Sequence, residues 1–81
     1  MATMRAKMKV EAITQHEAGE DLKFHAVCKT GGYPGDGSDE DNTYAKFSPS
    51  AELTISIRNP ALFGKFKPGE KYYVDFTQAE S

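Results

Sequence analysis

The chain alternates apolar and polar residues over 51–57, reading Ala-Glu-Leu-Thr-Ile-Ser-Ile. Alternation with a period of two places every second side chain on the same face, which is typical of a half-buried β-strand. An Asn-Pro pair at 59–60 ends this run, and a Pro-Gly pair at 68–69 turns the chain into a second alternating run over 72–76. Because no segment carries a helical period over 11 residues, the pattern predicts a small β-rich domain.

Further runs extend this pattern toward the N-terminus. Residues 4–12 place apolar side chains at even positions and charged ones at odd positions, which predicts a strand with a charged outer face. A turn over 16–20 leads to a second alternation over 22–28, so the two runs predict a hairpin. Residues 44–47 predict a short strand, and 51–58 predict the central strand of the sheet.

A short helical turn is predicted between the last two strands. Asn59 can cap it, and Pro60 can occupy its first position, where a missing N–H has no cost. Its apolar plug is expected to consist of Ala61, Leu62, Phe63 and Phe66. In the last strand, Tyr72, Val74 and Phe76 are expected to share one face.

Five strands with this turn predict a mainly β fold, a small five-stranded, partly open barrel or sandwich over residues 1–81. An OB-like barrel is one version, and a two-layer α+β arrangement is the alternative. A chain of 81 residues buries only about 60–65% of its unfolded surface and has little stability in reserve. Without metal or disulfide cross-links, self-association is the expected additional source of stability.

The cysteine count and the distribution of apolar residues indicate where the protein is expected to be. Cys28 is the only cysteine, which excludes an internal disulfide, is compatible with a reducing cytosol and predicts a small core residue. The N-terminus lacks the apolar run of a secretory signal, and no stretch is long and apolar enough for a membrane span. The expected location is therefore the cytoplasm, with no membrane partner.

A Gly-rich acidic loop is predicted over 30–43, and its length and composition predict mobility. Long loops often bind partners, and the alternative is a solvated connection that orders only against a neighbour. An EF-hand is excluded, because the twelfth position counted from Asp36 is Phe47 rather than Glu. The candidate partner-binding residues of this region are Tyr33, Asp36, Asp39, Glu40, Asp41 and Tyr44.

No catalytic or metal-binding pattern is visible in the sequence. His16 and His25 have no cysteine or second histidine at zinc spacing, the serines lack a matching His and Asp, and no phosphate-binding loop is present. We therefore expect a protein that is not an enzyme and uses no metal or cofactor.

The net charge of −2 conceals a basic start, an acidic middle and a basic turn over 65–71. Opposite charges separated in this way can steer one copy against another, although they are also ordinary for solvated loops. Four tyrosines beside the basic start suggest base stacking in an OB-like module for single-stranded nucleic acid. The pI of 5.6 and the acidic loop oppose binding to phosphates, so nucleic acid is a disfavoured partner.

Residues 36–79 resemble small uncharacterised proteins encoded by tailed bacteriophages and prophages, through motifs at 40–43, 47–50, 59–62 and 73–77. These motifs read Glu-Asp-Asn-Thr, Phe-Ser-Pro-Ser, Asn-Pro-Ala-Leu and Tyr-Val-Asp-Phe-Thr. They carry no catalytic residue. The resemblance implies a virion accessory of the capsid-decoration or connector type, made in the host cytoplasm and then carried in the virion.

The alternative that the resemblance implies is an anti-defence binder, which sequesters a small signalling nucleotide or blocks a host defence protein. Such a ligand would need cations and aromatic rings in one pocket, with Arg58, Lys65 or Lys67 beside Tyr44 or Tyr72 as the candidates.

The hypothesis from the sequence is thus a homo-oligomeric binding module that contacts a phage structural protein or a host protein through 31–42 and 65–71. Replacing Asp39, Glu40 and Asp41 with Ser is expected to weaken assembly without unfolding. Leu53→Ala or Ile55→Ala is expected to cost about 2–5 kcal/mol, as for core positions of a central strand.

Overall fold

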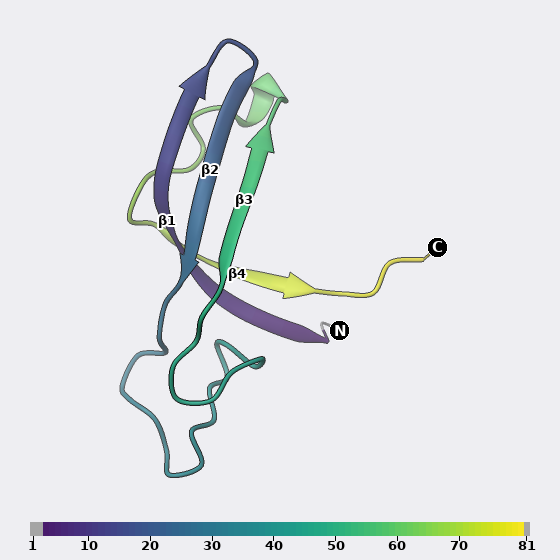
Figure 1. The fold of residues 1–81 in the computed structure, drawn as a ribbon. Helices are drawn as coiled ribbons and strands as arrows, with labels where there is room; N and C mark the ends of the chain where they lie inside the picture. The colour runs from purple at the N-terminus through teal and green to yellow at the C-terminus, as the bar shows by residue number, and fades with distance from the viewer. Residues whose placement is uncertain (1–2, 81) are drawn as a thin grey trace.

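Four antiparallel strands form one open sheet in the computed structural model, which describes residues 3–80 (Figure 1). The strands are β1 (Met4–His16), β2 (Gly19–Ala26), β3 (Glu52–Ile57) and β4 (Lys71–Phe76), and their order is β3-β2-β1-β4. The single turn of 3-10 helix η1 (Pro60–Leu62) lies between β3 and β4. The prediction of a mainly β fold with a hairpin and a helical turn is therefore confirmed.

The predicted strand over 44–47 is wrong, because these residues form turns and bends. Phe47 has φ of 64°, in the left-handed region that an extended strand cannot include. Among residues 3–80 the sheet therefore has four strands rather than five and two free edges, β3 and β4. The barrel, sandwich and OB-like predictions are not confirmed, and β3 is an edge strand rather than the predicted central one.

β1 changes partners along its length. Its first half pairs with β4 from Met4 to Lys9, and β2 pairs with it from Met8 onward. A register shift between Val10 and Ala12 marks a β-bulge, where one strand carries an extra residue and its facing pattern shifts by one. Ala6, Met8 and Val10 are therefore buried, whereas beyond the bulge Ala12 is exposed and Ile13 packs against the core.

One face of the sheet carries the apolar core, formed by Ala6, Met8, Val10, Leu22, Phe24 and Ile57. Directly opposed residues of antiparallel strands share a face. The pairing of Leu22 with Ile55 and of Met4 with Phe76 therefore places Ile55 and Phe76 on this apolar face. The same register confirms that Tyr72, Val74 and Phe76 share a face.

The helical turn forms as predicted, but most of the apolar side chains expected to anchor it do not pack against the core. Asn59 Oδ1 accepts a hydrogen bond from Ala61 N at 3.1 Å, which is the predicted cap. Ala61, Leu62 and Phe63 are exposed, and Phe66 alone of the expected plug packs against the core. The turn therefore ends β3 without covering the sheet.

One local feature completes the hairpin. Gly19 follows the β1–β2 turn with φ of +150°, and a Cβ there would overlap the carbonyl oxygen of Ile57, so only glycine lets β3 approach so closely.

Cys28 is exposed, so the prediction that it is a small core residue is wrong. β2 ends at Ala26, and the alternation that predicted the burial of Cys28 ends there.

Candidate functional site

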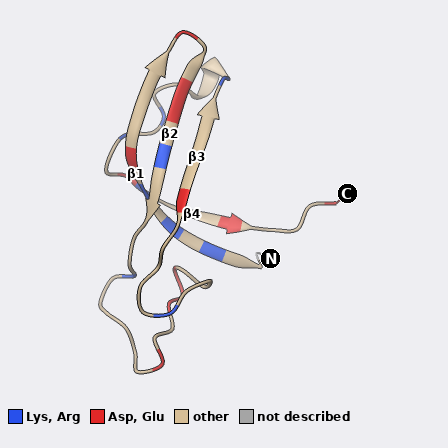
Figure 2. Ribbon diagram, in the orientation of Figure 1, with Lys and Arg blue, Asp and Glu red and all other residues tan. Residues whose placement is uncertain are grey.

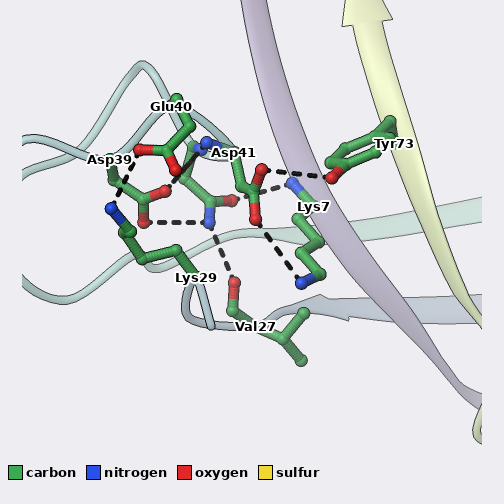
Figure 3. Close-up of polar contacts among 8 residues, drawn as sticks. Lys7, Val27, Lys29, Asp39, Glu40, Asp41 and Tyr73 are labelled. Atoms are coloured by element: carbon green, nitrogen blue, oxygen red, sulfur yellow. Dashed lines mark hydrogen bonds and ion pairs between the residues drawn. The ribbon is translucent and has the colours of Figure 1, made fainter. Parts of the chain in front are cut away.

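The acidic part of the β2–β3 connection folds back against the first half of β1 (Figure 3). Thr43 N donates to Arg5 O at 3.0 Å, and Arg5 N donates to Thr43 Oγ1 at 2.9 Å. These bonds occupy the edge of β1 that β2 leaves free, since β2 reaches only to the level of Met8. The acidic end of the predicted loop is therefore hydrogen-bonded to the sheet.

Asn42 holds this loop in place. It is fully buried, and its Oδ1 accepts from Lys7 N at 2.8 Å. Its Nδ2 donates to Val27 O at 2.9 Å and to Asp39 Oδ2 at 3.1 Å. One amide thus satisfies backbone groups of β1 and of the segment after β2. The sequence interpretation missed Asn42, and the available signal was an Asn three residues after an Asp in a Gly-rich loop.

Asp39 is also part of the fold, being 4% exposed. Its Oδ1 accepts from Asp41 N at 2.9 Å and from Asn42 N at 3.0 Å. Burial acts to raise the pKa of Asp39, but hydrogen bonds from Asn42 and Asp41 hold it below the usual 3.8. Replacing Asp39 would remove these bonds, so the triple replacement with Ser does not separate binding from folding as expected.

The basic start of the chain is matched by carboxylates of the same chain. Arg5 forms two hydrogen bonds to Asp75, at 2.7 and 3.1 Å, and its guanidinium lies 4.4 Å from the centre of the Tyr73 ring. Lys7 Nζ lies 3.4 Å from Asp41 Oδ2, and Tyr73 donates its hydroxyl to Asp41 Oδ1 at 3.1 Å. Figure 2 shows the basic bands of β1 beside the acidic band of β4. These cations are therefore already engaged within the chain.

Two of the predicted loop acids remain accessible. Glu40 is exposed and its Oε2 lies 2.9 Å from Lys29 Nζ, which keeps the pKa of Glu40 below its usual range. Asp36 is exposed and accepts from Ser38 N at 3.0 Å, which lowers the pKa of Asp36. These two side chains can meet a partner without disturbing the docked segment.

The two loop tyrosines point inward. The Tyr33 ring lies 6.0 Å from that of Phe47. The hydroxyls of Tyr33 and Tyr44 are buried without a hydrogen-bond partner among residues 3–80, and burial raises the pKa of both. Both rings therefore act mainly as packing residues of the loop.

The second predicted set is Arg58, Lys65, Lys67 and Tyr72, and three hollows of residues 3–80 together include Tyr72 but none of the set's three cations. Tyr72 packs edge-on against Phe24, and its hydroxyl donates to Glu70 Oε1 at 2.8 Å, which raises the pKa of Tyr72. Lys65 and Lys67 are exposed on the turn, and Arg58 is exposed beyond the end of β3. A hollow of about 110 Å³ beside Tyr72 is lined instead by Lys7, Lys71 and Tyr73.

A larger hollow of about 200 Å³ opens on the apolar face and contains the other predicted tyrosine, Tyr44. Its other lining residues are Met4, Ala6, Met8, Ser50, Ala51, Glu52, Leu53, Val74 and Phe76. Phe76 at its rim is 49% exposed, and Ile55 on the same face is 47% exposed. The alternation of β1 and β4 indicated this apolar face, but not that it would lack a cover.

Two features are absent from residues 3–80. No group of three or more His, Cys, Asp and Glu side chains there is arranged to hold a metal ion. No helix in this part of the chain has the length and apolar character to cross a bilayer.

The chain was compared with protein-family models, curated proteins and solved structures, and no match was found in any of the three. Its function is therefore inferred from its own surfaces. The surface that most needs a physical explanation is the partly uncovered apolar face, because exposed apolar side chains are unfavourable in water. The free edges of β3 and β4 lie beside it.

Proposed function

We propose that this chain is a non-enzymatic assembly module that associates with copies of itself through the uncovered apolar face of its sheet. The observation that carries the proposal is that Ile55 and Phe76 are about half exposed although they share a face with the buried Leu22 and Val10. A sheet with one apolar face is normally covered by a second layer. Here the segments around Tyr44 and Phe66 cover only part of it.

The dimensions of the molecule support the same proposal. The four strands of residues 3–80 belong to one sheet, and the chain measures 48 × 33 × 16 Å. These strands therefore supply no second sheet to pack on the apolar face at the usual spacing of about 10 Å. Exposed apolar patches of this kind mark interaction surfaces. Covering the exposed half of Phe76 or Ile55 would contribute about 1 kcal/mol each. Two copies packed face to face would make, between chains, the sandwich predicted within one chain.

We propose further that the assembled protein is a virion accessory of a tailed phage or prophage, of the capsid-decoration or connector type. The resemblance of residues 36–79 motivates this role, and accessible Asp36 and Glu40 offer polar contacts to a neighbouring structural protein. The protein would then be made in the host cytoplasm and end in the virion.

The other two functions suggested by the sequence have less support. Sequestering a signalling nucleotide requires cations around a pocket, whereas the hollow on the apolar face contains none of Arg58, Lys65 and Lys67. A wider hollow of about 350 Å³ in the acidic loop has two carboxylates, Asp39 and Glu40, against one cation, Lys46. Binding single-stranded nucleic acid requires cations free for phosphates, whereas Arg5 and Lys7 are paired with Asp75 and Asp41.

The experiment is sedimentation of the untagged protein over a wide concentration range, with native mass spectrometry of the same sample. The wild type is expected to form a closed oligomer, and Phe76→Ser is expected to raise its dissociation constant about tenfold or more, because it removes apolar area from the interface. Leu62→Ser is the matched control, since Leu62 is 45% exposed but lies on η1.

A wild type that stays monomeric throughout would contradict the proposal, as would equal effects of the two substitutions. An extra mass of a few hundred daltons retained on each subunit would favour the small-ligand function instead.

A further inference from the structure

The sequence of β3 and the residue after it is complementary to itself. Residues 52–58 read Glu-Leu-Thr-Ile-Ser-Ile-Arg. When a second copy runs antiparallel about Ile55, Leu53 faces Ile57, Thr54 faces Ser56 and Glu52 faces Arg58. We propose that two copies pair in this way along their β3 edges and form one continuous eight-stranded sheet. This inference goes beyond the proposed association through the apolar face, because it names a second, separate contact between copies.

The outer edge of β3 is available for such pairing. β3 is the outermost strand of the sheet of residues 3–80 and pairs with β2 alone. Its segment 53–57 contains no charge, proline or glycine, which are the usual devices that keep an edge strand from pairing. The other free edge, β4, carries Lys71 and Asp75 within the strand. β3 is therefore the less protected edge.

The alternation of backbone hydrogen-bonding directions along β3 is compatible with a two-fold axis at Ile55. Ala26 N donates to Ala51 O at 3.0 Å, so Ala51 directs its backbone toward β2. Because bonding directions alternate along an antiparallel strand, Thr54 and Ser56 direct their N–H and C=O groups to the free edge. Across the axis, Thr54 of one copy and Ser56 of the other can exchange both bonds. The two Ile55 residues then face each other at a non-bonded pair, where side chains approach most closely.

Charge complementarity selects this register. Glu52 and Arg58 are exposed, and neither forms an ion pair within residues 3–80. Pairing about Ile55 creates two symmetry-related Glu52–Arg58 pairs on the polar face. A slip of one residue would put apolar side chains opposite polar ones, and a slip of two would separate Glu52 from Arg58. The same pairing extends the apolar stripe of Leu53, Ile55 and Ile57 across both copies and covers Ile55.

The test is a charge-reversal cycle followed by sedimentation. Glu52→Arg alone and Arg58→Glu alone should each place like charges opposite one another and raise the dissociation constant about tenfold. The double variant restores opposite charges in every pair, so its dissociation constant should return to within about threefold of the wild type. Glu80→Arg, in the segment after β4, is the control for the charge change and should have no effect.

A backbone variant tests the edge without changing charge. Thr54→Pro removes an N–H that points to the free edge and that has no hydrogen-bond partner among residues 3–80. It should therefore block pairing while circular dichroism still shows the sheet. Single reversals that leave the dissociation constant unchanged, or a folded double variant that stays as weak as the singles, would overturn the edge pairing.

The two proposals fail in different ways. A wild type that is monomeric at every concentration would overturn both. An oligomer that Phe76→Ser dissociates but that Glu52→Arg, Arg58→Glu and Thr54→Pro leave intact would overturn the β3 contact and retain the proposed function.

Discussion

At the scale of single residues, Asn42 decides whether the long connection is a loose loop or part of the fold. Its amide bonds to Lys7 N, Val27 O and Asp39 Oδ2, and the side chain has no exposed surface. A buried polar group that loses its partner costs about 1–3 kcal/mol. The connection is therefore held by a few polar contacts rather than by apolar packing.

Asn42→Ala is predicted to lower the free energy of unfolding by about 3 kcal/mol, because Lys7 N and Val27 O lose their partner in a buried site. The measurement is the midpoint of urea unfolding followed by circular dichroism. The control is Asn59→Ala, which removes only the exposed cap of η1 and should cost about 1 kcal/mol or less. Equal losses in the two variants would contradict the anchoring role of Asn42.

At the scale of elements, position in the sheet determines how much an apolar residue contributes. Leu22 on β2 is 1% exposed, whereas its cross-strand neighbour Ile55 on β3 is 47% exposed. Both side chains lie on the apolar face, but β2 lies between two strands and β3 is at the edge. The loss of about 2–5 kcal/mol expected from the sequence for Ile55→Ala is therefore too large for the single chain.

Leu22→Ala is predicted to lower the free energy of unfolding by about 2–5 kcal/mol, because it leaves a cavity in the core. Ile55→Ala is predicted to lower it by about 1 kcal/mol, because about half of that side chain is already in water. Both values refer to protein diluted until sedimentation shows only monomer. Urea unfolding at the lowest measurable concentration gives them. A larger loss for Ile55→Ala than for Leu22→Ala would mean that β3 is covered in the single chain.

At the scale of the whole molecule, carboxylates at several places are stabilised in their charged form. A hydrogen bond from Arg5 lowers the pKa of Asp75 from its usual 3.8, and one from Tyr72 lowers the pKa of Glu70 from 4.5. The pKa of Asp21 is lowered by hydrogen bonds from Ser56 and His16. A carboxylate with a lowered pKa in the folded state stabilises the fold above its unfolded pKa. That stability is lost as the pH falls through the folded pKa.

These carboxylates are therefore predicted to leave the melting temperature unchanged between pH 7 and about pH 5. Below about pH 4.5 their protonation should lower the melting temperature. Asp75→Asn should melt lower than the wild type at pH 7 and lose less on acidification, because it lacks the charged partner of Arg5. Thermal melts across this range in low salt are the measurement, with Glu80→Gln as the control. Parallel pH profiles for wild type and Asp75→Asn would contradict the assignment.

Local chemistry alone was sufficient to predict the strands, the hairpin and the cap. The strand signals are the alternating runs 4–10, 51–57 and 72–76, and the helical turn is signalled by the Asn-Pro pair at 59–60. Each signal depends only on residues close together in the sequence, so the sequence predicts these elements correctly. The failure at 44–47 has the opposite cause. An alternating run of four residues is too short to outweigh the contacts that hold its neighbour Asn42 against β1.

By itself, the sequence determined that 4–10, 52–57 and 72–76 are extended and which of their side chains share a face, because both follow from the two-residue period of a strand. Only the tertiary structure decided that the sheet stays open, that β3 lies at its edge and that the acidic loop docks onto β1. These outcomes depend on which distant backbone groups find partners. The candidate partner-binding residues divide for the same reason: Asp36 and Glu40 face solvent, and Asp39 and Asp41 stabilise the loop. The apolar face, which no sequence motif marked, is the surface that we propose for binding.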